Sequence, residues 1–418
     1  MPASTSRPTI GRPSIGRRSL LGYVGTAAVG TAVGVGAGVT GARALDDTAS
    51  PGADSTTAPT GLGRTISPWG RHQPGVAAHP GAVTELVSLD LHARHHRAGD
   101  RDLLGRLLRV WTSDIEALTQ GKGTPGDTAP WLASADADLS VTVGFGPRLF
   151  AGAWDLPAPA GFAEVPAMTH DRLEKSWSGG DLVLVVSGRE GSTVGHAVRR
   201  LVADARPFAQ LRWRQSGSWN PYDPQGRPIT GRNLFGQVDG SGNPQPGTDL
   251  FDQTVWISDG VWQGGTTLVV RRIRMDLPTW DELTRSEQEG SMGRDLATGA
   301  PLTGGRELDD VVLSARDGGR FVVAPLSHVR RSHPSTNGGR RIFRKAANYE
   351  VSTGSEMEAG LLFQSYQRDL SDQFVPIQRM LDEGDELNEW TTAVGSAEFA
   401  VLPGFARGEW LGQGVLDG

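Results

Sequence analysis

The sequence predicts an α+β fold made of two successive β-α-β-β-α-β units with antiparallel sheets. Three observations support this prediction. Strand-like and helix-like patterns alternate along the chain in that order, once in each half. The 418 residues exceed the usual size of a single hydrophobic core. The 57 glycines and 26 prolines indicate many turns and short elements, which argues against a long helical bundle.

The first unit is expected between residues 67 and 225. Apolar runs and alternating segments predict its strands, and two amphipathic segments between them predict its helices. In chain order we expect a strand at 83–91, a helix at 100–118, strands at 139–145 and 181–187, a helix from the capping Ser192-Thr193 to about Gln210, and a strand at 212–219.

The second unit is expected between residues 226 and 418 and is more loosely patterned. No repeat between the two halves of the sequence is strong enough to prove duplication. In chain order we expect a strand at 266–275, a helix at 278–288 with Trp280 packed inward, strands at 321–325, 341–349 and 361–366, a helix at 373–381 despite Pro376, and a strand at 398–402.

Residues 1–44 have the features of an export signal. Arg17-Arg18 is followed by Ser19-Leu20-Leu21, a weakly apolar stretch of Gly, Ala and Val, and then Ala42-Arg43-Ala44, which fits A-x-A processing. We expect a twin-arginine signal that is removed after Ala44. The stretch is too rich in glycine for a secure membrane-spanning helix, and Ser-Leu-Leu replaces the Phe-Leu pair that such signals prefer. Residues 45–66 are small, polar and rich in Pro and Gly, which predicts a disordered linker.

Charge and cysteine content exclude several classes of function. The chain beyond residue 44 holds 36 of the 41 basic residues and all 47 acidic ones, a net charge of −11. This negative charge argues against a nucleic-acid partner. The absence of cysteine excludes disulfides, iron–sulfur clusters, thiolate-ligated haem and cysteine nucleophiles. Neither a phosphate-binding loop nor a GxSxG nucleophile elbow is present.

The histidines offer two places for a metal. His92, His95 and His96 (HARHH) have metal-like spacing, but they lie among arginines without a nearby carboxylate, which favours a solvated turn. His328 lies in SHVRRSHP, after the apolar segment 321–325 and before two arginines. Neutral imidazole is the usual haem ligand when cysteine is absent, and nearby cations can neutralise haem propionates. A histidine that merely ends a strand remains the simpler interpretation of that segment alone.

Two further segments carry charged groups of interest. In RRIFRKAANY (340–349) strand alternation places Ile342 and Arg344 on one face and Arg341 and Phe343 on the other. A guanidinium that points inward needs an anionic partner. An edge strand whose arginines are solvated accounts for the same sequence. In GQVDG (236–240) flanking glycines allow a bend that presents a carboxylate into a cavity, or an ordinary Asp-Gly turn.

Together these segments resemble the dye-decolourising peroxidases. GQVDG matches their GxxDG signature, and SHVRRSHP, RRIFRKAANY and GLLFQSYQRDL (360–370) follow in the family's order and approximate spacing. The similarity begins at the HQPG of residues 72–75 and ends at FAVLPG (399–404), so it covers nearly the whole chain after the linker. The chain looks like the exported branch that includes the deferrochelatase/peroxidase of bacterial iron uptake.

The resemblance implies a pair of ferredoxin-like modules, as in a dimeric α+β barrel, with haem b held mainly by the second module. His328 would be the proximal iron ligand, and Asp239 and Arg344 the distal catalytic pair. The remaining residues implied in haem binding are Leu361 and Phe363 on the apolar distal wall, Gly240 beside the carboxylate, and Arg330. The acid that should orient His328 is not identified by the sequence.

The resemblance also implies a reaction. Hydrogen peroxide is reduced at the iron after an ionised Asp239 moves a proton between its oxygens, and Arg344 stabilises the charge that develops. Electrons come singly from an organic or dye-like reductant. Trp213, Trp219, Tyr349 and Tyr366 are candidates for carrying them, and core packing also explains these aromatic residues. Position 346 is alanine where some relatives carry a polar distal residue.

Two alternatives remain open. The same pocket could hold haem so that its iron is released or delivered in iron acquisition, with an exported redox or iron-uptake partner. A non-haem protein with a metal at HARHH would show no haem absorption at all. The oligomeric state and the physiological reductant are not indicated by the sequence.

Overall fold

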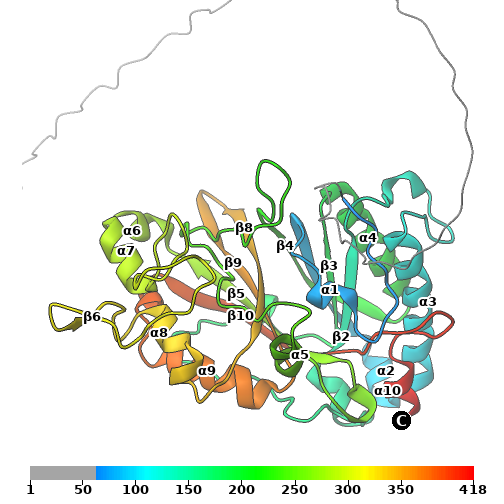
Figure 1. The fold of residues 1–418 in the computed structure, drawn as a ribbon. Coiled ribbons are helices and arrows are strands. Elements are labelled where there is room, and N and C mark those ends of the chain that lie inside the picture. Colours follow the sequence, from blue (N-terminus) through cyan, green and yellow to red (C-terminus); the bar gives the residue numbers. More distant parts are fainter. Residues whose placement is uncertain (1–62) are drawn as a thin grey trace, which may run out of the picture. The chain divides into compact units, whose positions relative to one another are not determined.

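A computed structural model describes residues 63–418, which fold around a closed barrel of eight antiparallel strands (Figure 1). Around the barrel the order is β1-β3-β2-β10-β5-β9-β8-β4. The barrel strands are β1 (Val83–Leu91), β2 (Ser140–Phe145), β3 (Leu182–Gly188), β4 (Ala209–Ser218), β5 (Thr266–Met275), β8 (Phe343–Thr353), β9 (Glu356–Gln367) and β10 (Thr391–Val401). The expected signal segment and residues 45–62 of the expected linker lie outside the described residues.

Each half of the chain contributes four strands in the same order. The first half pairs them as β4-β1-β3-β2, and the second half repeats this order as β10-β5-β9-β8. The halves join where β10 pairs with β2 and where Ser218 of β4 lies opposite Asn348 of β8. This topology confirms the predicted α+β fold of two ferredoxin-like units, and it shows that their sheets close into one barrel.

Strand alternation divides the core into layers. Leu86 and Val183 pack inside the barrel, whereas their chain neighbours Val87 and Leu184 pack against the helices outside. Two long helices, α3 (Arg101–Thr119) and α4 (Gly191–Ala205), cover the first half and bury a continuous apolar face against it. The outer layer of this half is therefore a dry hydrophobic core.

Shorter elements cover the second half. They are α6 (Leu277–Asp281), α7 (Arg285–Met292), α8 (His328–Ser332), a π-helical turn (Leu370–Phe374) and α9 (Val375–Asp382), with the small hairpin of β6 (Arg316–Asp317) and β7 (Arg320–Phe321) projecting from a long loop (Figure 1). The remaining helices are α1 (Pro74–Ala77), α2 (Ala93–Ala98), α5 (Asp249–Val255) and α10 (Gln413–Asp417), with 3₁₀ turns at Pro130–Leu132, Pro147–Phe150, Lys175–Trp177, Gly260–Trp262, Pro334–Thr336 and Glu386–Glu389.

Several expected boundaries are wrong for identifiable reasons. The strand expected at 321–325 contains only Phe321, because Pro325 cannot donate a ladder hydrogen bond and the chain turns instead, with Ser327 N donating to Ala324 O at 3.2 Å. The helix expected to reach Gln210 ends at Ala205, and Gln210 lies in β4. The helix expected at 278–288 is two helices, the second opened by a capping box at Thr284.

The end of the expected linker is attached to the folded body. Arg64 N donates to Asp138 Oδ1 at 2.5 Å, and Thr65 Oγ1 donates to Ala135 O at 2.7 Å. A few residues later Gln73 crosses between the halves, since its side chain bonds both Val143 in β2 and Leu402 after β10. The linker expected through residue 66 is therefore too long at its carboxyl end.

The HARHH segment is a short helix, α2, and not the solvated turn that we expected. His95 is buried, and His96 Nε2 lies 2.6 Å from Asp181 Oδ2, which Arg148 also pairs. The carboxylate that the local sequence lacked comes from the start of β3. Residues 63–418 contain no cluster of three or more metal-ligating side chains, so these histidines are explained by their structural partners.

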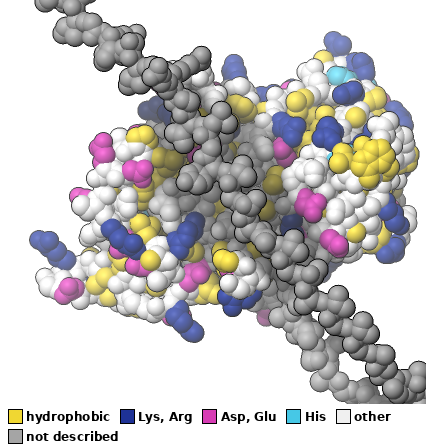
Figure 2. All heavy atoms as spheres, turned by 90° about the horizontal axis from the view of Figure 1, so that it is seen from above, with side chains coloured by type: hydrophobic (Ala, Val, Ile, Leu, Met, Phe, Trp, Pro, Cys, Tyr) yellow, Lys and Arg dark blue, Asp and Glu magenta, His cyan; other side chains and the backbone are white. Residues whose placement is uncertain are grey.

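The face of the described surface that is visible in Figure 2 is mixed in charge. Figure 2 shows cationic and anionic side chains interspersed over the visible face, without an extended basic stripe for a phosphate backbone. Within residues 63–418, no helix combines the length and the apolar character that a membrane crossing requires.

Candidate active site

A short irregular hairpin presents Asp239. Arg232 and Val238 form an isolated antiparallel bridge, and Asn233 N donates to Gln237 O at 3.1 Å. Gly236 at the turn and Gly240 after the carboxylate have φ angles of 80° and 132°, which side chains other than hydrogen rarely tolerate. The GxxDG pattern is thus a backbone requirement: the glycines bend the chain so that Asp239 faces a cavity.

Arg344 reaches the same cavity from β8. Burial alternates along this strand, with Phe343 and Lys345 facing the barrel interior and Arg344 facing outward, as strand alternation predicts. Asn243 fixes the strand at this position, because its amide donates to Arg344 O at 2.7 Å and its oxygen accepts from Arg344 N at 3.1 Å. The hairpin that carries the carboxylate and the strand that carries the guanidinium are therefore clamped together.

The Asp239 carboxylate and the Arg344 guanidinium form an ion pair. Arg344 Nη1 lies 3.7 Å from Asp239 Oδ1, and the side chains of Arg344 and Asp239 are only 25% and 14% exposed, respectively. Asn233 Nδ2 lies 3.4 Å from the other carboxylate oxygen. A cation and an amide donor therefore flank the mostly buried carboxylate.

His328 is the first residue of α8, and a carboxylate fixes its ring. Its Nδ1 lies 2.5 Å from Asp385 Oδ2, and Asp385 itself is held because its Oδ1 accepts from Leu387 N at 3.1 Å. No other described residue bonds Nε2, so that nitrogen is available for a ligand. Asp385 is the acid that the sequence could not identify, because it lies 57 residues away in a segment with several acids.

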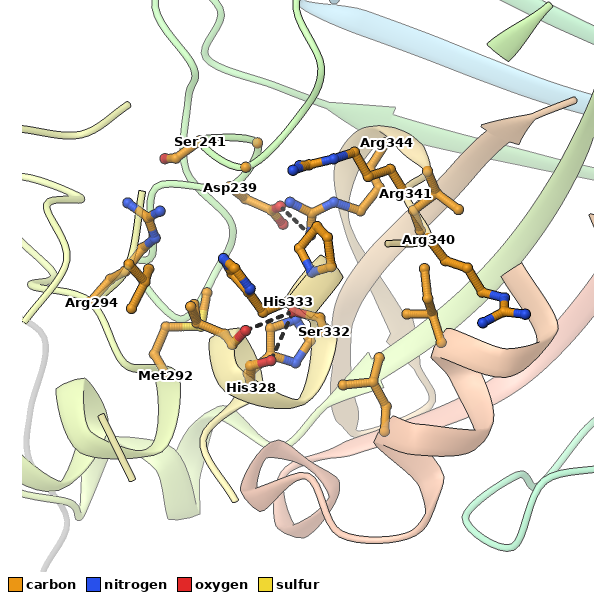
Figure 3. Close-up of a pocket in the computed structure, with 18 of the residues that line it drawn as sticks. Asp239, Ser241, Met292, Arg294, His328, Ser332, His333, Arg340, Arg341 and Arg344 are labelled. Atoms are coloured by element: carbon orange, nitrogen blue, oxygen red, sulfur yellow. Dashed lines mark hydrogen bonds and ion pairs between the residues drawn. The ribbon is translucent and has the colours of Figure 1, made fainter. Parts of the chain in front are cut away.

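The cavity lies between these two groups. Figure 3 shows His328 on one side and the joined Asp239 and Arg344 on the other. Apolar side chains complete the space between them, chiefly Ile342, Phe363, Phe374, Ile377 and Leu381. The arrangement is a slot with one imidazole below, one ion pair above and an apolar edge.

Two of the expected site residues lie off the cavity wall. Leu361 is on the same face of β9 as Phe363, but it packs in a separate cluster with Phe235 and Trp280. Arg330 points its guanidinium at the carbonyl oxygens of Val323, Ala324 and Leu313, so it stabilises the loop before α8. Gly240 and Phe363 do line the cavity.

Other cations on the wall were not singled out from the sequence. Arg341 lines the cavity, and no hydrogen bond or ion pair to its guanidinium is found within residues 63–418. Arg294 also lines it but donates to the carbonyls of Gly299 and Glu307. His333 is also on the wall, with its Nε2 2.9 Å from Asp310 Oδ1. The repeated Arg residues at 340–344 were the available signal for Arg341.

The four aromatic residues named from the sequence are packed and bonded. The indole nitrogens of Trp213 and Trp219 donate to Gly179 O and Thr230 O at 2.9 and 3.1 Å. Burial raises the pKa of the Tyr349 and Tyr366 phenols, which lie 3.0 Å from Glu358 and Gln364, respectively. Structural roles account for all four residues.

The donor set fits a haem. One neutral imidazole with a free nitrogen opposite a proton-accepting pair, inside an apolar slot, is the arrangement that a histidine-ligated haem requires. The unpartnered Arg341 supplies a positive charge where an anionic edge group could lie. The described residues offer no alternative cluster for a metal held by protein alone.

Comparison with known proteins agrees with this geometry. The family models "Dyp-type peroxidase, N-terminal" and "Dyp-type peroxidase, C-terminal" match residues 73–218 and 230–406. The dye-decolorizing peroxidase of Thermobifida fusca is 37% identical over 440 aligned positions, covering 99% of this chain and 100% of that protein. The deferrochelatase of Escherichia coli K12 is 29% identical over 372 positions, covering 83% and 86%.

A solved structure supports the same assignment. The DyP-type peroxidase from Cellulomonas bogoriensis is 44% identical, covers 86% of this chain and 100% of its own, and superposes with a TM-score of 0.79. Haem is the cofactor of this family. The predicted resemblance is confirmed: this chain belongs to the Dyp-type peroxidases, haem-dependent oxidoreductases that reduce hydrogen peroxide with electrons from a reducing substrate.

Proposed function

We propose that this chain binds haem b through His328 and activates hydrogen peroxide with Asp239 and Arg344. The observation that carries the proposal is the opposition of two prepared groups across one cavity. His328 keeps Nε2 free because Asp385 holds Nδ1, and the Asp239–Arg344 pair faces it. When bound, haem supplies the iron that accepts a peroxide oxygen and two oxidising equivalents.

Asp239 acts as the proton carrier. Its carboxylate takes the proton from the peroxide oxygen nearer the iron and returns it to the outer oxygen, which then leaves as water. The Arg344 guanidinium at 3.7 Å and Asn233 Nδ2 at 3.4 Å hold the two carboxylate oxygens in place at the cavity. The mostly buried position excludes bulk water from competing for the proton.

Arg344 stabilises developing charge. Its guanidinium carries a permanent positive charge, and Asn243 holds the backbone of the residue, so the donor needs little reorganisation. As the bond between the peroxide oxygens lengthens, negative charge builds on the outer oxygen. A fixed cation beside that oxygen lowers the barrier more than it stabilises neutral peroxide.

Asp385 and Arg341 have supporting roles. Asp385 accepts the Nδ1 proton of His328, which fixes the tautomer, orients the ring and increases electron donation from Nε2. Arg341 is the cation on the cavity wall that we assign to a haem propionate, in place of Arg330, whose donors already bond backbone carbonyls.

The decisive experiment is an absorption spectrum of the purified chain reconstituted with haem, taken before and after addition of peroxide. We expect a Soret band and a rapid spectral change with one equivalent of peroxide, followed by return to the starting spectrum when an organic electron donor is added. A chain that takes up no haem, or whose haem spectrum does not respond to peroxide, contradicts the proposal.

The deferrochelatase relatives support a second candidate, in which iron is removed from the bound haem. Release of iron with recovery of the intact metal-free porphyrin would favour it. Asp239→Asn separates the candidates, because this change should suppress peroxide turnover but leave an iron-release activity that does not need the distal carboxylate.

We also propose that residues 1–44 direct export of the folded chain by the twin-arginine pathway, to the cell envelope or beyond. The Arg17-Arg18 pair, the apolar stretch and the Ala42-Arg43-Ala44 site support this, and a cofactor inserted before transport gives a reason for the route. Replacement of both arginines by lysine should trap the uncleaved chain inside the cell. Continued export of that variant would exclude the pathway.

A further inference from the structure

A second cavity lies directly behind the distal pair. It has a volume of about 400 Å³, and Asp239, Gly240 and Arg344 belong to its wall as well as to the wall of the first cavity. Exposed Leu308 lies on the same wall. The space is large enough for a chain of water molecules, which need a few polar partners each. The distal pair therefore separates the first cavity from a compartment that begins near the surface.

Besides Asp239, the wall of the second cavity carries the carboxylate of Glu307, and one oxygen of that carboxylate accepts no hydrogen bond from the described residues. Oε1 accepts from Thr230 Oγ1 and, at 3.3 Å, from Ser241 Oγ. No hydrogen bond to Oε2 is found anywhere in the described part of the chain. The residue is half-buried, and Arg294 holds its backbone by donating to Glu307 O at 2.7 Å. The carboxylate is thus fixed at one oxygen and open at the other.

Ser241 links this carboxylate to the first cavity. Its hydroxyl donates to Glu307, and the residue lines the first cavity two positions after Asp239 (Figure 3). Asp239 and Glu307 also share the wall of the second cavity. The Ser241 hydroxyl therefore connects Glu307 to the first cavity, and the second cavity offers space that water can fill between Glu307 and Asp239.

We propose that Glu307 is the outer carboxylate of a proton relay that serves Asp239 through Ser241 and the second cavity. The inference rests on the proposed peroxidase function. Reduction of one hydrogen peroxide to two water molecules consumes two electrons and two protons. The organic donor loses its electron and proton where it is oxidised, so protons must reach the mostly buried distal site separately. Glu307 takes them from solvent and passes them inward, and it remains unchanged after each transfer.

Other charged groups near Glu307 are already engaged or are part of the distal pair. Lys345 Nζ donates to Gly75 O and Ala78 O, and His79 Nε2 lies 2.8 Å from Pro221 O. The titratable and charged groups around the second cavity and the Glu307 backbone are Asp239, Arg344, Lys345, His79, Arg294, Arg306 and Asp309. Asp239 and Glu307 are the carboxylates that line the second cavity, and of these two Glu307 has an oxygen, Oε2, without a hydrogen bond or ion pair in the described part of the chain.

The test is Glu307→Gln in the haem-loaded full chain. Glutamine keeps an oxygen that can accept from Thr230 and Ser241, but it cannot exchange a proton in the same way. We expect an unchanged ferric spectrum and an unchanged KM for the donor. We expect kcat to fall roughly tenfold at the alkaline end of the pH profile, where hydronium is scarce, with a larger solvent isotope effect. Glu356→Gln, at the exposed start of β9, is the matched control.

Cyanide binding gives a readout that does not depend on turnover. Hydrogen cyanide must transfer its proton to the chain as its carbon bonds the ferric iron, so Glu307→Gln and Ser241→Ala should both slow cyanide association. Glu307→Gln with the pH profile and cyanide rate of the control would overturn the relay, and so would a variant that slows only because its ferric spectrum is altered. Failure of the unaltered chain to bind haem would contradict the proposed function and not the relay.

Discussion

The two halves of the barrel share a strand order but differ in what covers them. In the first half α3 and α4, 19 and 15 residues long, seal the sheet with a continuous apolar layer. In the second half the longest described helices, α7 and α9, have eight residues each, and loops fill the remaining space. Shorter cover leaves room for a cavity, and the loops supply its polar side chains.

Within one barrel, the outer face of the first half mainly stabilises the fold, and the outer face of the second half carries the functional groups. The first half devotes its outer face to apolar burial, which contributes roughly 25 cal/mol per Å² removed from water. The second half interrupts that layer with Asp239, Arg344, His328 and Asp385, whose polar groups are paired with one another. Substitutions in the second half should therefore change haem spectra and rates, whereas those in the first half should change unfolding.

The largest expected effect is that of His328→Ala. Loss of the nitrogen opposite the distal pair should lower peroxidase activity by more than about 100-fold and shift the Soret band. Absorption spectroscopy and steady-state turnover measure both. Added imidazole should restore part of the original spectrum.

His92→Ala in the first half is the control, because that ring bonds only the Arg206 carbonyl in the described structure. A His328→Ala chain with the native ferric spectrum would show that the ligand assignment is wrong. Loss of haem from the His92→Ala chain would indicate that the HARHH segment takes part in haem binding.

The next largest effect is expected for Arg344→Leu. Removal of the cation should lower the rate constant for reaction with peroxide by about 10²–10³-fold, because the charge on the departing oxygen loses its stabilising donor. Stopped-flow absorption gives this rate, and the resting spectrum should change little. A variant that reacts with peroxide as fast as the unaltered chain would remove Arg344 from the mechanism.

Asp385→Asn, on the His328 side of the cavity, should have a smaller effect than Arg344→Leu. Loss of the carboxylate that holds His328 Nδ1 should weaken haem affinity or activity by about 10–100-fold and raise the iron reduction potential. Spectroelectrochemical titration measures the potential. Glu386→Gln, which changes the adjacent carboxylate, is the comparison. Equal potentials for Asp385→Asn and the unaltered chain would mean that the short contact has no electronic role.

The smallest effect is expected in the first half and only on stability. Burial raises the pKa of Asp114 to about 8, with a further contribution from the neighbouring Asp204. The folded chain therefore holds a proton that the unfolded chain has lost above about pH 4, and stability decreases as pH rises from there toward 8. Asp114→Asn should raise the Tm at pH 8 by at least about 2 °C.

Calorimetry at pH 5 and pH 8 checks the sign of this prediction. The gain from Asp114→Asn should shrink at the lower pH, where the unfolded carboxyl recovers part of its protonation, and the haem spectrum should stay the same at both. A variant that is destabilised equally at both pH values would show that this carboxyl makes a hydrogen bond that an amide cannot replace.

The local sequence pattern was sufficient to predict those strands in which the strand-like pattern runs through the whole segment. The strand ranges 83–91 and 266–275 are correct to the residue, because both segments are dense in apolar and β-branched residues. The segment 321–325 has the same composition and is not a strand beyond Phe321, since Pro325 and the absence of a neighbouring strand decide against it.

The candidate site was partly visible in the sequence. Asp239, Arg344 and His328 stood out through glycine placement, strand alternation and the family's motif order, and the fold brings all three to one cavity. Arg330 and Leu361 could not be separated from Arg341 and Phe363 by pattern, because the two arginines are the same residue type and the two apolar residues lie on one face of the same segment. The contacts that separate them depend on the tertiary structure: Arg330 bonds carbonyls of the loop before α8, and Leu361 packs in the cluster with Phe235 and Trp280.

By itself the sequence determined the alternation of strands and helices, the family motifs and the exclusion of cysteine chemistry, because these depend on residue type and on spacing along the chain. Only the tertiary structure decided that Asp385 holds His328, that Asp181 partners the HARHH helix and that Glu307 faces the second cavity. Those contacts join residues 57 or more positions apart, or from different loops, and the packing of loops and helices around the sheet brings them together.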